Sequence, residues 1–345
     1  MRLFWIAALA LMSSACGAGP LPAAFGPYHA GVDGGSAPET QLPSIVAGGF
    51  ETPFGIALAG QTLYLTDRAA GELLSVPLAG GTPKVVADDL GDPTWLATAG
   101  TNLFLVDAAG RRVLRATPAG VVTAIGSGLV VPGRIVAGGG RIFWLDQGTS
   151  GGLGVIYSAP DDGSGSALLA GLVFPQDIAY LGGKLYISER GRLVSCTSGA
   201  VYGSDRPRVS VIPATGGTPT VLYTAAKWED GYPAGLAVDA EGQDVYFTQP
   251  QFCSGAGAVA KVAVSDGTAT LLSDAPPGAR RIEVGDADAV FASGQNLSIT
   301  PIGGGPYQDI AVMTAVGDFL ITHGRLYWTD QLAGEVLSMP LPGES

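Results

Sequence analysis

The sequence has little charge and few of the side chains that enzymes most often use for proton transfer or metal binding. Only 14% of the 345 residues are Asp, Glu, Lys or Arg, and the chain has two histidines and three cysteines. Acidic residues outnumber basic ones by 30 to 18, so the formal net charge is −12. A field of this sign repels phosphate backbones, and no basic stripe offsets it. The composition therefore argues against a nucleic-acid-binding protein.

Long amphipathic helices are also missing from the pattern. No stretch sustains apolar residues at the i, i+3, i+4 and i+7 positions of a helix. What the chain has instead is 53 glycines and 24 prolines, which separate short runs of Val, Ile, Leu, Tyr, Phe and Thr. This pattern is typical of strands and turns and predicts an all-β protein.

The N-terminus has the features of an export signal. Arg2 precedes an apolar run from Leu3 to Met12, which is too short to span a bilayer and typical of a signal peptide over residues 1–15. The segment Ser13-Ser14-Ala15-Cys16 resembles the lipobox of bacterial lipoproteins, whose cysteine becomes the acylated first residue. That family usually has Leu where this chain has Ser13, and the same small residues also suit ordinary secretion.

We therefore expect Cys16 to carry a lipid that holds the protein in the cell envelope, at a membrane's outer leaflet or periplasmic side, with secretion as the alternative. Residues 16–42 are rich in Gly, Ala and Pro and read as a flexible tether. The two other cysteines, Cys196 and Cys253, are expected to form a disulfide in an oxidising compartment. Two unpaired buried thiols are the alternative.

From residue 43 to 345 one pattern recurs about every 40 residues, which indicates a repeat architecture. Each copy has a Pro-x-x-apolar strand, a Gly turn, an apolar-aromatic strand that ends on a polar residue, and two further short strands. The second strands of the seven copies are residues 63–67, 103–107, 142–146, 185–189, 245–249, 289–293 and 326–330. Four short strands are the content of one propeller blade, and such blades must stack to bury their faces.

The repeat also predicts how the ring closes. The seventh copy stops after its third strand, near Met339, whereas residues 42–47 resemble the fourth strand of the first copy. Pairing this N-terminal strand with the last three would leave no open edge. We predict a seven-bladed β-propeller, with six blades as the alternative because the sixth copy is degenerate.

Tyr327-Trp328-Thr329-Asp330 matches the signature of YWTD propellers, and Pro53-Phe54-Gly55-Ile56-Ala57 resembles the start of NHL-type repeats. The resemblance implies the propeller fold and says nothing of a ligand. YWTD propellers have six blades, whereas this chain counts seven. The acids that recur after the second strands are expected to accept backbone N–H groups in turns rather than to form a catalytic cluster.

Two families of enzymes with propeller folds have known kinds of site residues that can be sought in this sequence. Gluconolactonase-like propellers bind a divalent metal through Glu, Asn and Asp, but this chain has only two asparagines, Asn102 and Asn296. Streptogramin-lyase-like propellers use histidines as acid and base, and the repeat region holds only His323, which falls in an expected turn. We expect no cofactor and no bound metal, and a binding protein rather than an enzyme.

The residue placed just before each first strand is expected to face the central channel. These residues are Gly55, Trp95, Arg134, Asp177, Gly235, Arg281 and Asp318. The charged and aromatic members suit a polar, aromatic or sugar-like ligand. Alternatively, Arg134 pairs with Asp177, and Arg281 with Asp318, in a self-satisfied ring. Trp228 and Tyr232, in the loop before the fifth copy, are further candidate contacts.

The sequence thus predicts a non-catalytic ligand- or protein-binding or scaffolding propeller of the bacterial cell envelope. Its expected partner is a protein or a small polar ligand, with no nucleic acid, membrane contact only through the lipid anchor, and a monomeric state. Two insertions on one face, residues 190–207 and 250–258, carry Cys196 and Cys253. A metal-dependent hydrolase or lyase with its site at the channel mouth is the alternative function.

Overall fold

The computed structural model describes residues 42–148, 153–162, 165–192, 205–225, 231–250, 257–312 and 315–342. All of them belong to the second of the chain's two units, Gln41–Ser345. Within them every regular element is a β-strand. They include no helix of the length and apolar character needed to cross a membrane.

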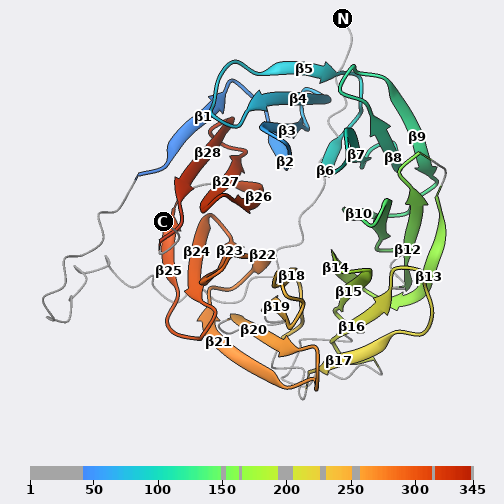
Figure 1. Cartoon of the computed structure of the whole chain (residues 1–345), viewed down its shortest axis with the longest axis vertical. Helices are drawn as coiled ribbons and strands as arrows, with labels where there is room; N and C mark the ends of the chain where they lie inside the picture. The colour runs from blue at the N-terminus through green and yellow to red at the C-terminus, as the bar shows by residue number, and fades with distance from the viewer. Residues whose placement is uncertain are drawn as a thin grey trace, which may run out of the picture. The chain divides into compact units, whose positions relative to one another are not determined.

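The strands form seven four-stranded antiparallel sheets around one axis, which makes the second unit a seven-bladed β-propeller (Figure 1). The first four blades are β2–β5 (Pro53–Ala59, Thr62–Asp67, Glu72–Pro77, Lys84–Ala87), β6–β9 (Pro93–Ala99, Asn102–Asp107, Arg112–Ala116, Val122–Ser127), β10–β13 (Pro132–Gly138, Arg141–Asp146, Leu153–Pro160, Ser166–Val173) and β14–β17 (Pro175–Leu181, Lys184–Glu189, Arg208–Pro213, Thr220–Thr224). The others are β18–β21 (Leu236–Val238, Asp244–Gln249, Gly257–Ala263, Ala269–Ala275), β22–β25 (Ala279–Val284, Asp288–Ser293, Asn296–Pro301, Gln308–Ala311) and β26–β28 (Val316–Thr322, Arg325–Asp330, Glu335–Pro340) with β1 (Ser44–Gly48).

The seventh blade contains both ends of the repeat region, as the sequence predicts. Strand β1 pairs with β28, with Ser44 opposite Ser338 and Ile45 opposite Leu337. The Ser44 hydroxyl donates a hydrogen bond to the Ser338 carbonyl oxygen at 3.1 Å. The ring therefore closes by sheet pairing between segments from opposite ends of the chain.

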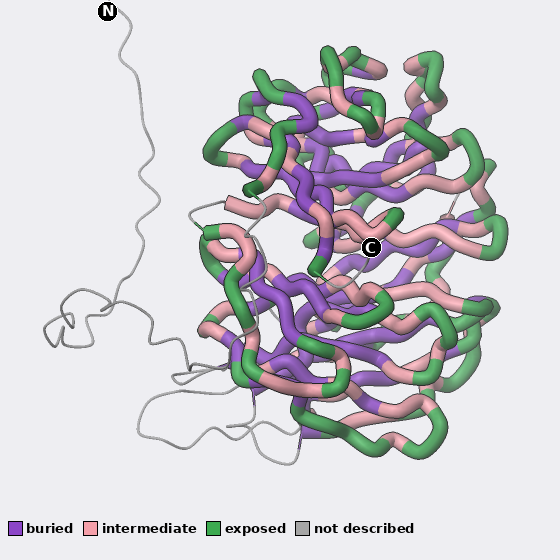
Figure 2. The backbone as a smooth tube through the Cα atoms, turned by 60° about the vertical axis from the view of Figure 1, so that its left-hand side comes forward, coloured by how far each residue is buried: buried purple, intermediate pink, exposed green. Residues whose placement is uncertain are grey.

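The hydrophobic core lies between blades and in their interiors, while the turns at the two faces are exposed (Figure 2). One cluster packs Phe104 and Val106 of the second blade against Ile142 and Trp144 of the third. At the closure, Val46 of β1 belongs to a cluster with residues of blades one and seven. Burying one large apolar side chain contributes about 1.5–3 kcal/mol, so each blade depends on its neighbours for much of its stability.

The acids at the ends of the second strands accept backbone N–H groups in the turn that follows, as predicted: Asp107 accepts the Gly110 N–H at 2.8 Å. They also accept N–H groups from the segment before the first strand, which the sequence did not predict. Asp67 accepts hydrogen bonds from the Glu51 and Thr52 N–H groups at 2.7 and 2.9 Å, before the first strand of its own blade. Asp146 accepts from Val130 and Val131 in the same way, both at 2.9 Å. These carboxylates fix the chain as it passes from one blade to the next.

In some blades, the residue just before the acid at the end of the second strand has a hydroxyl group that bonds to the neighbouring blade. Thr329 accepts the Asp318 N–H at 3.1 Å and donates to the Phe54 carbonyl of blade one at 2.7 Å. Ser188 donates to the Ala234 carbonyl of the next blade at 2.8 Å and accepts the Asp177 N–H at 3.0 Å. The Thr of the Tyr-Trp-Thr-Asp signature thus orients the channel-facing residue and binds the next blade.

One sequence expectation needs correction at the start of six of the seven blades. In six blades the channel-facing residue does not precede the first strand but lies inside it, because the strand begins about two residues earlier; only Gly235 precedes its strand, β18. Pro93 already pairs with Asp107, and the register then shifts before Leu96, which leaves Trp95 within an irregular segment of β6. The same irregularity occurs between Ala279 and Arg281 in β22.

His323 lies in the turn between β26 and β27, as predicted. Its φ is 51°, the left-handed conformation that Gly60 adopts in the first blade with a φ of 60°. The side chain is exposed, and its Nδ1 lies 2.9 Å from the Thr322 hydroxyl oxygen. This place in an exposed turn accounts for His323 without a catalytic role.

Candidate functional site

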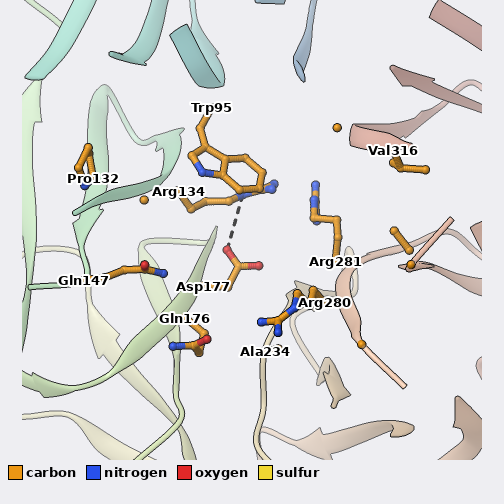
Figure 3. Close-up of a pocket in the computed structure, with 15 residues that line it drawn as sticks. Trp95, Pro132, Arg134, Gln147, Gln176, Asp177, Ala234, Arg280, Arg281 and Val316 are labelled. Carbon is orange, nitrogen blue, oxygen red and sulfur yellow. Dashed lines mark ion pairs between the residues drawn. The ribbon is translucent and has the colours of Figure 1, made fainter. Parts of the chain in front are cut away.

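A cavity of about 430 Å³ opens at the axis, on the face where the first strands begin (Figure 3). Its wall is formed by the starts of first strands from six blades, β6, β10, β14, β22 and β26 together with the segment before β18. Because residues from so many blades encircle it, the cavity lies on the ring axis. A volume of this size is within the range of about 300–1,000 Å³ that small-molecule sites occupy.

Four of the predicted channel residues line this cavity together: Trp95, Arg134, Asp177 and Arg281. The Arg134 guanidinium lies over the Trp95 ring, 5.1 Å from its centroid, in cation–π geometry. The Phe54 ring of the first blade packs against the Trp95 indole in a T-shaped arrangement, with the two ring centroids 5.0 Å apart. The indole is therefore held between two blades and keeps a fixed orientation at the cavity wall.

Arg281 is fully engaged with protein groups. Its Nε donates to the Asp318 carboxylate at 2.8 Å, Nη1 donates to the Ile282 carbonyl, and Nη2 bonds Glu283 and the Phe319 carbonyl. Burial alone would lower the pKa of Arg281, but attraction to the carboxylates around it, Glu283 first, outweighs burial and raises it. This arginine is a permanently charged structural element.

Asp177 is held mainly by backbone groups. One carboxylate oxygen accepts the Ile178 N–H at 2.8 Å, and the other accepts the Leu236 N–H of the next blade at 3.0 Å. Burial raises the pKa of Asp177, and the attraction of Arg134 and Arg281 only partly opposes this effect. Because both oxygens are already engaged, this carboxyl connects blades four and five.

Arg134 is held loosely by comparison. Its closest carboxylate contacts are 3.5 Å from Nη1 to Asp318 and 3.7 Å from Nε to Asp177 and from Nη2 to Glu283. These distances allow electrostatic attraction but exceed those of hydrogen bonds. Its Nη1 is buried without a hydrogen-bond partner among the described residues. The pairing of Arg134 with Asp177 and of Arg281 with Asp318 is therefore observed in both cases, but with different strength.

Residues that sequence reasoning missed complete the site. Arg280, Gln147 and Gln176 line the cavity, and Glu283 contributes to the ion-pair layer beneath it. Glu283 could have been found by following β22 two residues inward from Arg281, because alternate side chains face the same way. The equivalent positions in the other blades are apolar: Ala57, Ala97, Val136, Ala179, Ala237 and Leu320.

A second cavity of about 320 Å³ lies further along the axis, beyond the ion-pair layer. Its lining continues along the first strands, with apolar residues such as Val136 and Ala179, and includes both Glu283 and Arg134. Arg134 thus borders both cavities, whereas Asp318 lines neither. The charged residues form a layer that separates the two parts of the channel.

The charged layer does not suit a metal ion. Within the described ranges, no group of three or more His, Cys, Asp or Glu side chains is arranged to hold one. The channel carboxylates Asp177, Asp318 and Glu283 alternate with two guanidinium groups, which would repel a cation.

The remaining predicted residues are not among those that line the cavity. Tyr232 is buried, and its hydroxyl accepts a hydrogen bond from Nη1 of Arg280 at 3.3 Å, so it supports the cavity rim from behind. Gly55 and Gly235 occupy ring positions where a Cβ would lie 2.3 and 2.2 Å from a carbonyl oxygen of the adjacent blade. Trp228, Cys16, Cys196 and Cys253 lie outside the described residues.

Comparison with known proteins shows the fold and no more. No model of a protein family matches the chain, and a search of curated protein sequences finds no match. Virginiamycin B lyase from Staphylococcus aureus has 12% sequence identity and a TM-score of 0.67, and the match covers 87% of this chain and 98% of that chain. Oligogalacturonate lyase in complex with manganese has 13% identity and a TM-score of 0.60, over 82% and 86%. A chain of the nidogen/laminin complex has 18% identity and a TM-score of 0.51, over 68% and 87%.

These three structures support a propeller of this kind, but they differ in what they do. Two are described as lyases, and the third is part of a complex between proteins. At identities below 20%, likeness of fold does not transfer a site. The function has to be argued from the residues of this chain.

Proposed function

We propose that this protein is a non-catalytic binding propeller of the bacterial cell envelope, which holds a small polar ligand in the axial cavity. The observation that carries the proposal is the gathering of Trp95, Arg134, Asp177 and Arg281 around a cavity of about 430 Å³. An aromatic face with a few fixed polar groups in a concave site is the usual composition of a ligand pocket.

The chemistry of the wall favours binding over catalysis. The amides of Gln147 and Gln176 and the guanidinium groups orient a ligand but do not accept protons near neutral pH. Asp177 is the one carboxylate among the lining residues, and both of its oxygens accept backbone N–H groups. It is therefore poorly placed to exchange a proton with a ligand.

A cavity-filling variant tests the proposal. Gly133 lines the cavity, and a Cβ there would meet no atom closer than 3.5 Å, so Gly133→Leu places a side chain in the wall with little strain. We expect this variant to lose binding of small polar metabolites that protect the wild-type protein in a thermal-shift screen. Gly303→Leu is the matched control, because Gly303 lies in an open exposed turn with nothing within 4 Å of a Cβ.

The same screen separates the binding function from a metal-dependent hydrolase or lyase. Ca²⁺, Mg²⁺, Mn²⁺ and Zn²⁺ are added in turn to wild type and to Gly133→Leu. We expect no thermal shift from any of them that depends on Gly133. A shift of several degrees that the variant abolishes would favour the metal-dependent enzyme and count against the present proposal.

The location is proposed from the sequence. The short apolar run before Ser13-Ser14-Ala15-Cys16 supports export and acylation of Cys16, and the Gly/Ala/Pro-rich segment up to residue 42 would serve as a tether. A clickable palmitate analogue should label the protein, and the label should be lost in Cys16→Ser. Labelling that persists in the variant would rule out Cys16 as the acceptor.

A further inference from the structure

Positive charge is concentrated in one cavity of an acidic protein. The chain has 18 Lys and Arg residues and a net charge of −12, yet three arginines line the axial cavity. These are Arg134, Arg280 and Arg281, and Asp177 is the one carboxylate beside them in the wall. The wall thus has a formal charge opposite in sign to that of the whole molecule.

The carboxylates that balance this charge lie away from the cavity. Asp318 is buried behind Arg281, and Glu283 borders the second cavity on the other side of the layer. The charged layer is therefore polarised, with its guanidinium groups toward the first cavity. An anion entering the cavity would meet the positive side of this layer first.

The three arginines differ in how much of their hydrogen-bonding capacity is free. Arg281 bonds two carboxylates and two carbonyls, so little remains for a ligand. Arg134 approaches its carboxylates only to 3.5–3.7 Å, and its guanidinium lies over the Trp95 ring. Arg280 is exposed at the rim, where its Nη1 is bonded to Tyr232. A guanidinium that is paired this loosely keeps N–H groups that can donate to a ligand oxygen.

We infer that the axial cavity binds a small organic carboxylate, whose charged group is received by Arg134 and Arg280 while Trp95 packs against its body. The inference rests on the proposed binding function and names the ligand class of the same site. The planar fork of a guanidinium matches the two oxygens of a carboxylate, and such charge-assisted pairs are about twice as strong as neutral hydrogen bonds. Gln147 and Gln176 then offer amide groups to hydroxyls or carbonyls of the ligand.

The test uses matched probes that differ in one charged group. Glucuronate is compared with glucose, and phenylacetate with phenylacetamide, by ligand-observed NMR titration of the purified mature chain. We expect each carboxylate to bind at least about tenfold more tightly than its neutral partner. Gly133→Leu should abolish binding of both carboxylates, which places the site in the cavity.

Arginine variants then assign the recognition to individual side chains. Arg134→Gln should remove the roughly tenfold preference for carboxylate, and Arg134→Lys should restore part of it because the charge returns without the fork. Arg280→Gln, at an exposed position where folding is not at risk, should reduce the preference several-fold. Arg111→Gln removes the same charge from an exposed turn residue that does not line the cavity, and it should change nothing.

The outcomes separate this inference from the proposal it rests on. If the neutral partners bind as tightly as the carboxylates, and Gly133→Leu abolishes both, the cavity binds ligands but the carboxylate inference is wrong. If the preference survives in both Arg134→Gln and Arg280→Gln, it is also wrong. If neither probe pair nor any metabolite of the screen binds in the cavity, the proposed function itself fails.

Discussion

Arg134 and Arg281 occupy the same position in the third and sixth blades, yet the structure uses them differently. Each is the channel-facing residue of a first strand, and each is followed by a blade that presents an aspartate at the equivalent position. Arg281 bonds its aspartate at 2.8 Å, whereas Arg134 remains 3.7 Å from its own. One side chain is a structural element and the other keeps a free donor.

The residue two places further along the strand explains the difference. Glu283 faces the channel next to Arg281 and captures its Nη2, but the corresponding residue of blade three is Val136, which offers no acceptor. The aspartates differ as well, because Asp177 is already engaged by two backbone N–H groups. Neighbouring acceptors, more than the position in the repeat, thus decide whether a channel arginine is available to a ligand.

Removing Arg281 should have the largest effect on stability. Arg281→Met leaves the buried Asp318 without its main cation and removes the nearest cation from the half-buried Glu283. Breaking a buried ion pair in this way costs about 3–5 kcal/mol. Urea denaturation followed by circular dichroism gives the free energy of unfolding. Arg281→Lys, which keeps the charge without the fork, should fall between the variant and wild type. A loss no greater than that of Arg134→Gln would contradict the division between the two arginines.

Thr329 supports Arg281 indirectly, because its hydroxyl accepts the N–H of Asp318 and donates to the Phe54 carbonyl across the closure. Thr329→Val leaves both buried backbone groups without partners and should lower the free energy of unfolding by about 2 kcal/mol. Thr329→Ser keeps the hydroxyl and serves as the control. Equal losses in the two variants would show that packing, and not the hydroxyl, accounts for the effect.

Arg134→Gln should destabilise the fold less, by about 1 kcal/mol, because no short hydrogen bond is lost and Arg281 still attracts the three carboxylates. The same urea titration measures it. Its main consequence should be on ligand binding, whereas a change in stability as large as that of Arg281→Met would mean that both arginines are structural.

The smallest effect concerns pH. The pKa of Asp177 is raised in the folded protein by burial, so the folded state holds this proton more tightly than the unfolded chain does. Its contribution to stability is therefore present at acidic pH and is lost as pH rises from the ordinary Asp range through the raised pKa. Asp177→Asn removes this titration. The stability of wild type relative to this variant should decrease as pH rises, and a difference that stays constant with pH would contradict the argument.

Much of the fold could be predicted from the sequence because the repeat carries it. Seven copies of one strand pattern, and the likeness of residues 42–47 to a fourth strand, are sufficient to predict the blades and their closure. Repeat phase also predicts which side chains face the channel, since equivalent positions in stacked blades point the same way. Four of those residues do line one cavity.

The rest of the site depends on features that do not show in the repeat pattern. Arg280 and Gln176 immediately precede channel-facing residues, so strict alternation would turn them away from the axis. The register shifts at the starts of β22 and β14 bring both to the cavity wall instead. Which arginine has all its hydrogen-bond donors engaged depends on the distances among five charged groups. A linear sequence does not contain these distances.

Guanidinium NMR of the free protein tests the division between the two arginines most directly. In arginine labelled with ¹³C and ¹⁵N, rotation about the Nε–Cζ bond averages the Nη signals unless hydrogen bonds prevent it. The account predicts separate, slowly exchanging Nη–H signals for Arg281 and averaged signals for Arg134, with assignments confirmed by the loss of each set in the corresponding glutamine variant. Separate signals for both arginines, or averaged signals for Arg281, would contradict it.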